Sequence, residues 1–292
     1  MLLNLSQINT FLKHDELVIK NSSLSEVRDI LIFCYKWSIS DMIEIILIVS
    51  VLFLILTFFY KQAICDFRIN QMEWTQHEQL IELLGEKIPL VVRSIPSATF
   101  WTHDDVMERP CFKELPIFKD VSLQQWLSTA TPQSICPWKY TQAEIIADAS
   151  GISIWAQKWM NPVIIPTLLK LWMFPRYHCW AGNVGLRKTF ATWTCIFPVD
   201  GDMMVTIMPE SMESSLPASW VDCIPSQLTT KDTPFVHDLK FIDIILRPGH
   251  CLFMPAHWFV SWTSPTKPVM VCTISYHTPI SYLAFRSSPY IT

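Results

Sequence analysis

Glycine and charged residues are scarce in this chain, and each shortage excludes a class of protein. Of its 292 residues, 6 are glycine and 16% are charged, while 50% are hydrophobic. The composition excludes collagen-like and disordered chains, and so few glycines disfavour phosphate-binding loops. The 22 basic and 26 acidic residues give a net charge of −4, which offers polyanions no general attraction. We therefore expect no nucleic-acid partner.

Paired cysteine motifs are also missing. The 9 cysteines are scattered from Cys34 to Cys272 without a C-x-x-C pair. This spacing argues against a zinc ribbon and against a small disulfide scaffold. We interpret the cysteines as buried reduced thiols, which favours a domain that faces the cytosol or is assembled there.

One long apolar run stands near the N-terminus. Residues 42–60 read MIEIILIVSVLFLILTFFY. As a helix this run would be about 28 Å long, close to the thickness of the hydrocarbon layer of a bilayer. A buried core helix is an alternative; a cleaved signal peptide fits poorly, because some forty mixed residues precede the run and no small-residue cleavage site follows it. We expect a retained single-pass transmembrane helix over residues 41–61.

The segment before this helix, residues 1–40, holds a second helical pattern. Ser23 and Glu26 have the spacing of a capping box, and apolar residues from position 24 to position 34 fall on one helical face. An amphipathic helix over residues 23–37 is expected, lying on the bilayer, on a partner or within the protein. Basic residues flank the apolar run equally on both sides, so the charge rule does not orient it.

The remaining residues, 67–292, are expected to form one domain that is mainly β with added helices. Asp200-Gly201 lies between two β-rich runs, and this dipeptide predicts a tight hairpin over residues 189–208. Further strands are expected at residues 88–93, 239–246, 249–254 and 269–276.

Helices are expected before the strands. Residues 72–84 fit a helix that ends at Gly85. Thr102 is a candidate N-cap, with Asp105 at the third helical position. His103 and Asp105 also form an H-x-D pattern, which we interpret as part of this helix start and not as a metal site.

The run LRPGHCLFMPAHW, residues 246–258, resembles the P-G-D-x-L-x-x-P-x-x-W stretch of JmjC and cupin-like proteins. The resemblance extends over roughly residues 72–280, since the strand at 88–93 followed by Phe100-Trp101, and the hairpin ending at Met208-Pro209, occur in the family's order. It implies a double-stranded β-helix barrel, preceded here by the transmembrane helix.

Active members of this family bind Fe(II) and 2-oxoglutarate through a His, a carboxylate two residues later and a second His. By analogy the first pair falls near residues 188–191, where Phe190 and Thr192 cannot replace it, and no His, Asp or Glu occurs from Asn183 to Val199. The second His falls at Val260, followed by Ser261. No catalytic, cofactor-binding or metal-binding residue is therefore assigned, because three donors on one face are needed to hold the iron.

Four histidines remain as alternative donors, but none has a carboxylate two residues later. They are His178, His250, His257 and His277. The 13 tryptophans are expected to fill the core, with Phe190, Trp193 and Phe259 filling a former substrate cavity; an aromatic protein interface is the alternative.

The resulting prediction is a membrane-anchored, catalytically inactive JmjC/cupin-like protein. It would contact the lipid bilayer through residues 42–60 and act as a structural or protein-binding component, for example a minor structural protein of a membrane-containing virion. Its barrel would lie on the cytosolic side or inside the virion. The alternatives are a membrane-bound Fe(II)/2-oxoglutarate hydroxylase with a shifted ligand set, and a small-molecule-binding barrel with an open polar cavity.

Overall fold

The structure is a computed structural model that describes residues 39–62, 67–96, 101–118, 121–131, 134–165, 167, 170–265 and 267–288. The expected amphipathic helix at residues 23–37, Cys34 and Cys65 lie outside these residues. The chain divides into two compact units, Met1–Phe58 and Phe59–Thr292.

Helix α3, Ile39–Lys61, contains the long apolar run of the sequence. Its segment Met42–Lys61 is long and apolar enough to cross a membrane, and its most apolar stretch is not buried by the rest of the protein. The hydroxyl of Ser50 donates a hydrogen bond to the carbonyl of Ile46 at 2.7 Å. That polar group is therefore satisfied within the helix, as an apolar environment requires.

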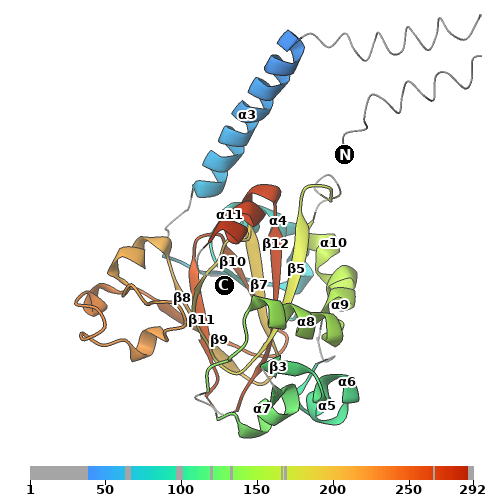
Figure 1. Cartoon of the computed structure of the whole chain (residues 1–292), viewed down its shortest axis with the longest axis vertical. Helices are drawn as coiled ribbons and strands as arrows, with labels where there is room; N and C mark the ends of the chain where they lie inside the picture. Colours follow the sequence, from blue (N-terminus) through green and yellow to red (C-terminus); the bar gives the residue numbers. More distant parts are fainter. Residues whose placement is uncertain are drawn as a thin grey trace, which may run out of the picture. The chain divides into compact units, whose positions relative to one another are not determined.

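The second unit is built on two sheets (Figure 1). The six-stranded sheet has the order β1 (Asn70–Glu73), β2 (Leu90–Arg93), β10 (Cys251–Pro255), β7 (Trp193–Asp200), β12 (Met270–His277) and β5 (Phe174–Ala181). The four-stranded sheet has the order β6 (Val184–Lys188), β11 (Phe259–Thr263), β8 (Met203–Met208) and β9 (Ile242–Leu246). A small third sheet pairs β3 (Pro116–Phe118) with β4 (Val121–Ser122).

From β5 onward the strands alternate between the two large sheets, except that β8 and β9 are neighbours in the four-stranded sheet. The chain changes sheet from β5 to β6, from β7 to β8, and from β10 through β11 to β12. The fold is mainly β with added helices, as expected, and is consistent with a β-sandwich or cupin-like arrangement. No ladder between the described residues joins the two large sheets, so closure into a barrel stays a prediction.

The expected hairpin at residues 189–208 has the predicted turn, but its two strands do not pair with each other. Gly201 adopts a φ of 86°, which a glycine at a tight turn accommodates without strain. However, β7 pairs with β10 and β12, while β8 pairs with β11 and β9. The turn therefore carries the chain from one sheet to the other.

Helices surround the sheets, and one expected helix begins later than predicted. Residues 72–84 were expected to be helical, but Met72 lies in β1, which pairs in parallel with β2, and the helix begins at His77. The N-cap at Thr102 is confirmed, with a reciprocal capping box to Asp105. The helices of this unit are α4 (His77–Gly85), α5 (His103–Glu108), α6 (Pro110–Lys113), α7 (Leu123–Thr129), α8 (Tyr140–Ser150), α9 (Ile152–Trp159), α10 (Asn161–Ile164) and α11 (Pro279–Ser287). Short 3₁₀ turns are η1 (Trp74–Gln76), η3 (Glu210–Ser215), η4 (Pro225–Gln227) and η5 (Val236–Asp238).

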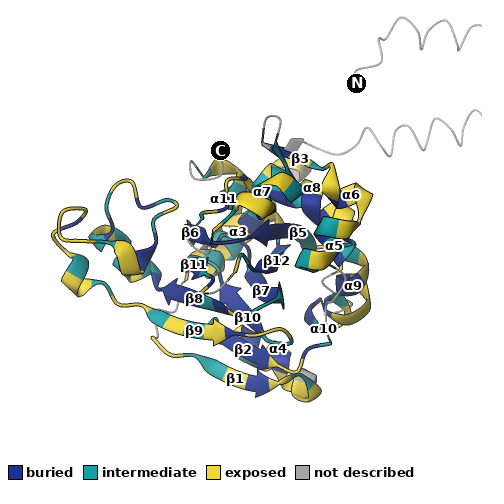
Figure 2. Cartoon of the chain, turned by 90° about the horizontal axis from the view of Figure 1, so that it is seen from below, coloured by how far each residue is buried: buried dark blue, intermediate teal, exposed yellow. Residues whose placement is uncertain are grey.

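The six-stranded sheet is covered on one face by helices. Strand alternation places Cys179 and Phe197 on this face. Ser150 of α8 contacts Cys179, and the ring of Trp155 in α9 lies 5.0 Å from that of Phe197. The central strands β7, β10 and β12 are buried, as their dark blue colour in Figure 2 shows.

The four-stranded sheet has a smaller core on its outer face. Leu186, Met208 and Phe259 of its strands pack with Leu216 and Trp220 of the segment between β8 and β9. The ring centroids of Trp220 and Phe259 are 4.9 Å apart in an edge-on arrangement. The segment from Glu210 onward is thereby fixed against the sheet.

Candidate functional site

A small cavity lies between the two large sheets. The centres of water molecules can occupy about 40 Å³ of it, which is room for about three waters. Most of its wall is apolar. Strand β6 and the residues after it supply Arg187 to Ala191, and β11 supplies Val260 and Trp262. Strand β12 supplies His277 on the opposite side.

The positions that the resemblance to JmjC and cupin-like proteins marks as ligand positions lie on the wall of this cavity. Lys188, Thr189, Phe190 and Ala191 line it, and so does Val260. Val260 pairs with Arg187 in the β11–β6 ladder, which explains the convergence of two segments about seventy residues apart. The structure therefore brings together the two segments to which the resemblance pointed.

The donor atoms on the cavity wall are of the wrong kind for a 2-His-1-carboxylate site. Its one imidazole is His277, its charged groups are Arg187 and Lys188, and none of its lining residues is Asp, Glu or Cys. An ammonium or guanidinium has no lone pair for a metal and repels it. Across the described residues, no three His, Cys, Asp or Glu side chains are grouped as a metal ion would require.

His277 is neutral at ordinary pH. Burial lowers the pKa of its imidazole to about 3, with the charges of nearby His178 and Arg176 acting in the same direction. Its Nδ1 lies 3.3 Å from the hydroxyl of Ser281 in α11, so the ring is held from its other side. A neutral, hydrogen-bonded histidine in this place is a core residue with one edge on the cavity.

A second histidine, His178, belongs to a charged group on β5 and α8. Its Nε2 lies 3.5 Å from a carboxylate oxygen of Glu144, which also accepts a hydrogen bond from Arg176 Nε at 2.8 Å. The contact with His178 and, to a lesser extent, the hydrogen bond from Arg176 lower the pKa of Glu144 to about 2, although burial acts in the opposite direction. Burial lowers the pKa of His178. The carboxylate of Glu144 is thus already paired with Arg176 and His178.

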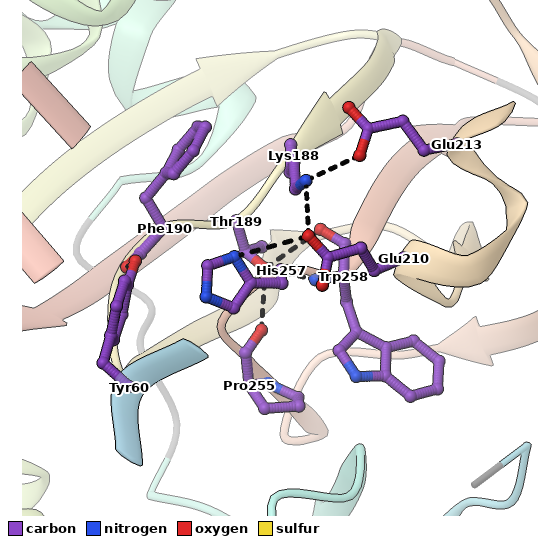
Figure 3. Close-up of polar contacts among 9 residues, drawn as sticks. All are labelled: Tyr60, Lys188, Thr189, Phe190, Glu210, Glu213, Pro255, His257 and Trp258. Atoms are coloured by element: carbon purple, nitrogen blue, oxygen red, sulfur yellow. Dashed lines mark hydrogen bonds and ion pairs between the residues drawn. The ribbon is translucent and has the colours of Figure 1, made fainter. Parts of the chain in front are cut away.

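A third group of charges lies at the end of β6, where Lys188 contacts two carboxylates (Figure 3). Lys188 Nζ is 2.8 Å from Glu210 and 2.8 Å from Glu213, and its side chain is 10% exposed. Burial opposes the ammonium charge, but the two carboxylates outweigh it and raise the pKa of Lys188. We call Lys188, Glu210 and Glu213 the Lys188 cluster.

His257 lies beside this cluster and not in the cavity. Its Nδ1 is 3.8 Å from Glu210, and its ring packs against Tyr60 with centroids 4.8 Å apart (Figure 3). Tyr60 donates a hydrogen bond to the carbonyl of Phe190 at 2.6 Å. His257 adopts a φ of 70°, a left-handed conformation that non-glycine residues rarely take, and its backbone N–H donates to the carbonyl of Thr189 at 2.7 Å.

The expected filling of the cavity agrees with the position of Phe190 and is wrong for the other two aromatic residues. Phe190 lines the cavity. Phe259 instead packs on the outer face of the four-stranded sheet, because it is adjacent to Val260 and neighbouring strand residues point to opposite faces. Trp193 belongs to the main core and is not among the lining residues.

Two other candidates have structural roles. Asp105 caps α5 and forms an ion pair with Arg109 at 2.6 Å, so the H-x-D pattern is a helix start. His250 lies in the turn before β10, where its N–H donates to the carbonyl of Arg247 at 2.8 Å. The Lys188 cluster was not predicted from the sequence. The signal that could have indicated it is a single lysine at the end of a buried strand, because such a lysine has no acidic partner nearby in the sequence.

Comparison with known proteins gives no family for this chain. No family model matches the chain, and no curated protein matches it. The chain is similar to the crystal structure of hydroquinone 1,2-dioxygenase from Sphingomonas sp. TTNP3 with 4-hydroxybenzoate bound, at 13% identity and a TM-score of 0.26. The match covers 38% of this chain and 63% of that protein, so it spans less than two thirds of the dioxygenase. At this score the likeness carries no argument about activity.

Proposed function

We propose that this protein is a membrane-anchored, cupin-like component that works by binding other proteins and has no iron-dependent activity. Helix α3 supports the anchor, because it has the length and composition of a spanning helix. The two-sheet domain supplies a rigid body attached to that anchor. Since a fold by itself does not determine function, the proposal rests on the chemistry of the cavity.

The observation that carries the proposal is the set of side chains at the converged ligand positions. Lys188, whose ammonium is occupied by Glu210 and Glu213, is one of them, and the aliphatic Val260 is another. The remaining imidazole, His277, offers one nitrogen at most, since Ser281 occupies the other. A facial site for iron needs three donor atoms and three open positions. This wall supplies neither three donor atoms nor a negative charge to balance the cation.

Metal binding by the full-length chain in detergent tests the proposal. We expect iron well below one equivalent after anaerobic incubation with Fe(II) and desalting, and no decarboxylation of 2-oxoglutarate. The His277→Ala and His178→Ala variants serve as matched controls and should retain the same low iron content. One equivalent of iron that is lost in either variant, together with 2-oxoglutarate turnover, would overturn the proposal in favour of a hydroxylase with a shifted ligand set.

A further inference from the structure

Four cysteines lie side by side across the six-stranded sheet. Cys179 of β5, Cys272 of β12, Cys195 of β7 and Cys251 of β10 are all fully buried on the face covered by helices. Their sulfurs form two close pairs, with Sγ–Sγ distances of 3.1 Å for Cys179 and Cys272 and 2.8 Å for Cys195 and Cys251. The members of each pair are 93 and 56 residues apart in sequence.

The backbone suits a covalent bond at Cys179–Cys272, whereas the case for Cys195–Cys251 rests on the short distance between their sulfurs. Cys272 and Cys179 are direct partners in the antiparallel β12–β5 ladder. Directly opposed residues have Cα atoms about 4.5–5.5 Å apart, within the range of about 4.4–6.8 Å that disulfides need. Cys195 lies opposite Phe253 on β10, so Cys251 is its diagonal neighbour, and their side chains turn toward each other on one face.

We propose that Cys179–Cys272 and Cys195–Cys251 are disulfide bonds in the working protein, formed as the chain folds. In each pair two thiols lose two protons and two electrons to the disulfide of a thiol–disulfide oxidoreductase, which becomes a dithiol. The exchange passes through a mixed disulfide between the enzyme and one cysteine of the pair. This inference is independent of the proposed function.

The order of events follows from burial. Helices α8 and α9 cover the face that carries these sulfurs, and burial raises the pKa of Cys195 and Cys272. A protonated, enclosed thiol neither attacks a disulfide nor is reached by one. Oxidation therefore precedes the docking of these helices, and bonds formed then are shielded from reductants.

A shared metal ion is the competing explanation for four neighbouring thiols. A tetrahedral zinc site would need all four sulfurs about 2.3 Å from one point. The described residues contain no such grouping of even three donor side chains, so these sulfurs are two pairs and not one cluster.

The inference revises the expectation of reduced, buried thiols throughout the chain. Cys111 is exposed and Cys223 is partly exposed, so neither fits that description, while Cys136 is buried. Two disulfides would also place the domain on the oxidising side of its membrane, or inside a particle assembled there, instead of in the reducing cytosol.

The test is peptide mapping of the full-length chain, isolated in detergent from the membranes in which it is made and alkylated during unfolding without reductant. We expect linked peptides that join Cys179 to Cys272 and Cys195 to Cys251. Cys136 is the matched control: it is also buried, at 5% exposure against 0% for the four, no contact between its sulfur and another sulfur is found among the described residues, and it should be alkylated. Alkylation of all four cysteines, or links between other pairs, would overturn the inference.

A second measurement separates a covalent bond from simple packing. Dithiothreitol should lower the urea midpoint of the wild-type chain, and it should have a smaller effect on the Cys179→Ala/Cys272→Ala double variant. With a bond present, each single variant should lose nearly as much as the double variant, because either change removes the bond. A midpoint that is insensitive to reductant in the wild type contradicts the inference, even if the variants are less stable.

Discussion

At the scale of single residues, Gly185 of β6 has the least freedom to change. A Cβ atom built on Gly185 would lie 2.1 Å from the backbone carbonyl oxygen of Asp222, which no side-chain movement can relieve. The strand and the segment beyond Trp220 are in close contact there, with Leu186 N–H donating to the carbonyl of Cys223 at 2.7 Å. The approach of two backbones therefore requires glycine.

We predict that Gly185→Ala lowers the free energy of unfolding by about 3 kcal/mol or more, because the backbones must separate. Gly85 is the matched control: nothing lies within 4 Å of its added Cβ, and it ends helix α4. Gly85→Ala should be neutral or slightly stabilising, by up to about 1 kcal/mol. Urea denaturation followed by tryptophan fluorescence measures both, and equal midpoints for the two variants would refute the prediction.

His277 gives the chain a pH-dependent stability. Its pKa is about 3 in the folded protein, whereas an unfolded histidine titrates near 6.5. Between these values the unfolded chain binds the extra proton, so the free energy of unfolding falls as the pH falls from about 6.5 toward 3. The slope attributable to this residue is on the order of 1.4 kcal/mol per pH unit.

His277→Asn should reduce this dependence between pH 6.5 and pH 5, where Glu144 does not yet contribute; His178, whose pKa burial also lowers, keeps part of the slope. The exposed His237 provides the control, since His237→Asn should leave the slope of the wild type unchanged. Urea midpoints at pH 7, 6 and 5 supply the measurement. A slope in His277→Asn as steep as in the wild type would show that other groups cause the acid sensitivity.

At the scale of elements, the Lys188 cluster joins strand β6 to the 3₁₀ turn η3. The ammonium is nearly buried, while the carboxylates of Glu210 and Glu213 are about one-third exposed, at 35% and 36%. Lys188→Met removes the charge that keeps two carboxylates together. Breaking a fully buried pair costs about 3–5 kcal/mol, and partial exposure reduces this, so we expect a loss of about 2 kcal/mol.

The triple variant Lys188→Met/Glu210→Gln/Glu213→Gln should regain most of this stability, because it leaves no unpaired charge. Arg247→Ala is the comparison: Arg247 pairs with Asp202 at 3.6 Å with both side chains more than half exposed, and its loss should cost less than about 1 kcal/mol. Thermal unfolding of the four proteins tests the ordering. No recovery in the triple variant would mean that the lysine stabilises through its apolar stem.

Local signals predicted the elements whose cause is local. The capping box at Thr102 and the turn at Gly201 depend on neighbouring residues, and both are present. The error at Met72 and the wrong strand pairing across Gly201 have one cause: strand partners are chosen by tertiary contacts. Met72 pairs with Val92 in a parallel ladder, which local periodicity does not reveal.

For the cavity, the resemblance to JmjC and cupin-like proteins pointed to residues 188–191 and to Val260. The β11–β6 ladder brings these residues to one cavity. The positions of His277, the Lys188 cluster and the cysteine pairs depend on strands far apart in sequence. The contacts that these residues make can be identified only once the register of the sheets is known.

At the scale of the whole molecule, helix α3 determines whether the chain is held by a bilayer. Val51 and Leu54 lie near the middle of the apolar segment. Val51→Arg/Leu54→Arg should disfavour insertion by about 6–7 kcal/mol, more than the roughly 5 kcal/mol that the apolar run contributes. We predict that this variant is extracted from membranes by alkaline carbonate, whereas Val51→Ala/Leu54→Ala remains in the pellet. Retention of the arginine variant would contradict a spanning role.

The order of strands in the six-stranded sheet determines when the domain can be completed during synthesis. Strand β2 is made early, but its antiparallel neighbour β10 follows some 160 residues later, and β5 waits for β12, near the end of the chain. Such distant pairings form slowly and leave apolar strands without partners meanwhile. During synthesis, β2 therefore gains its antiparallel neighbour only once β10 has been made, and β5 gains its neighbour only once β12 has been made, so this sheet is completed late.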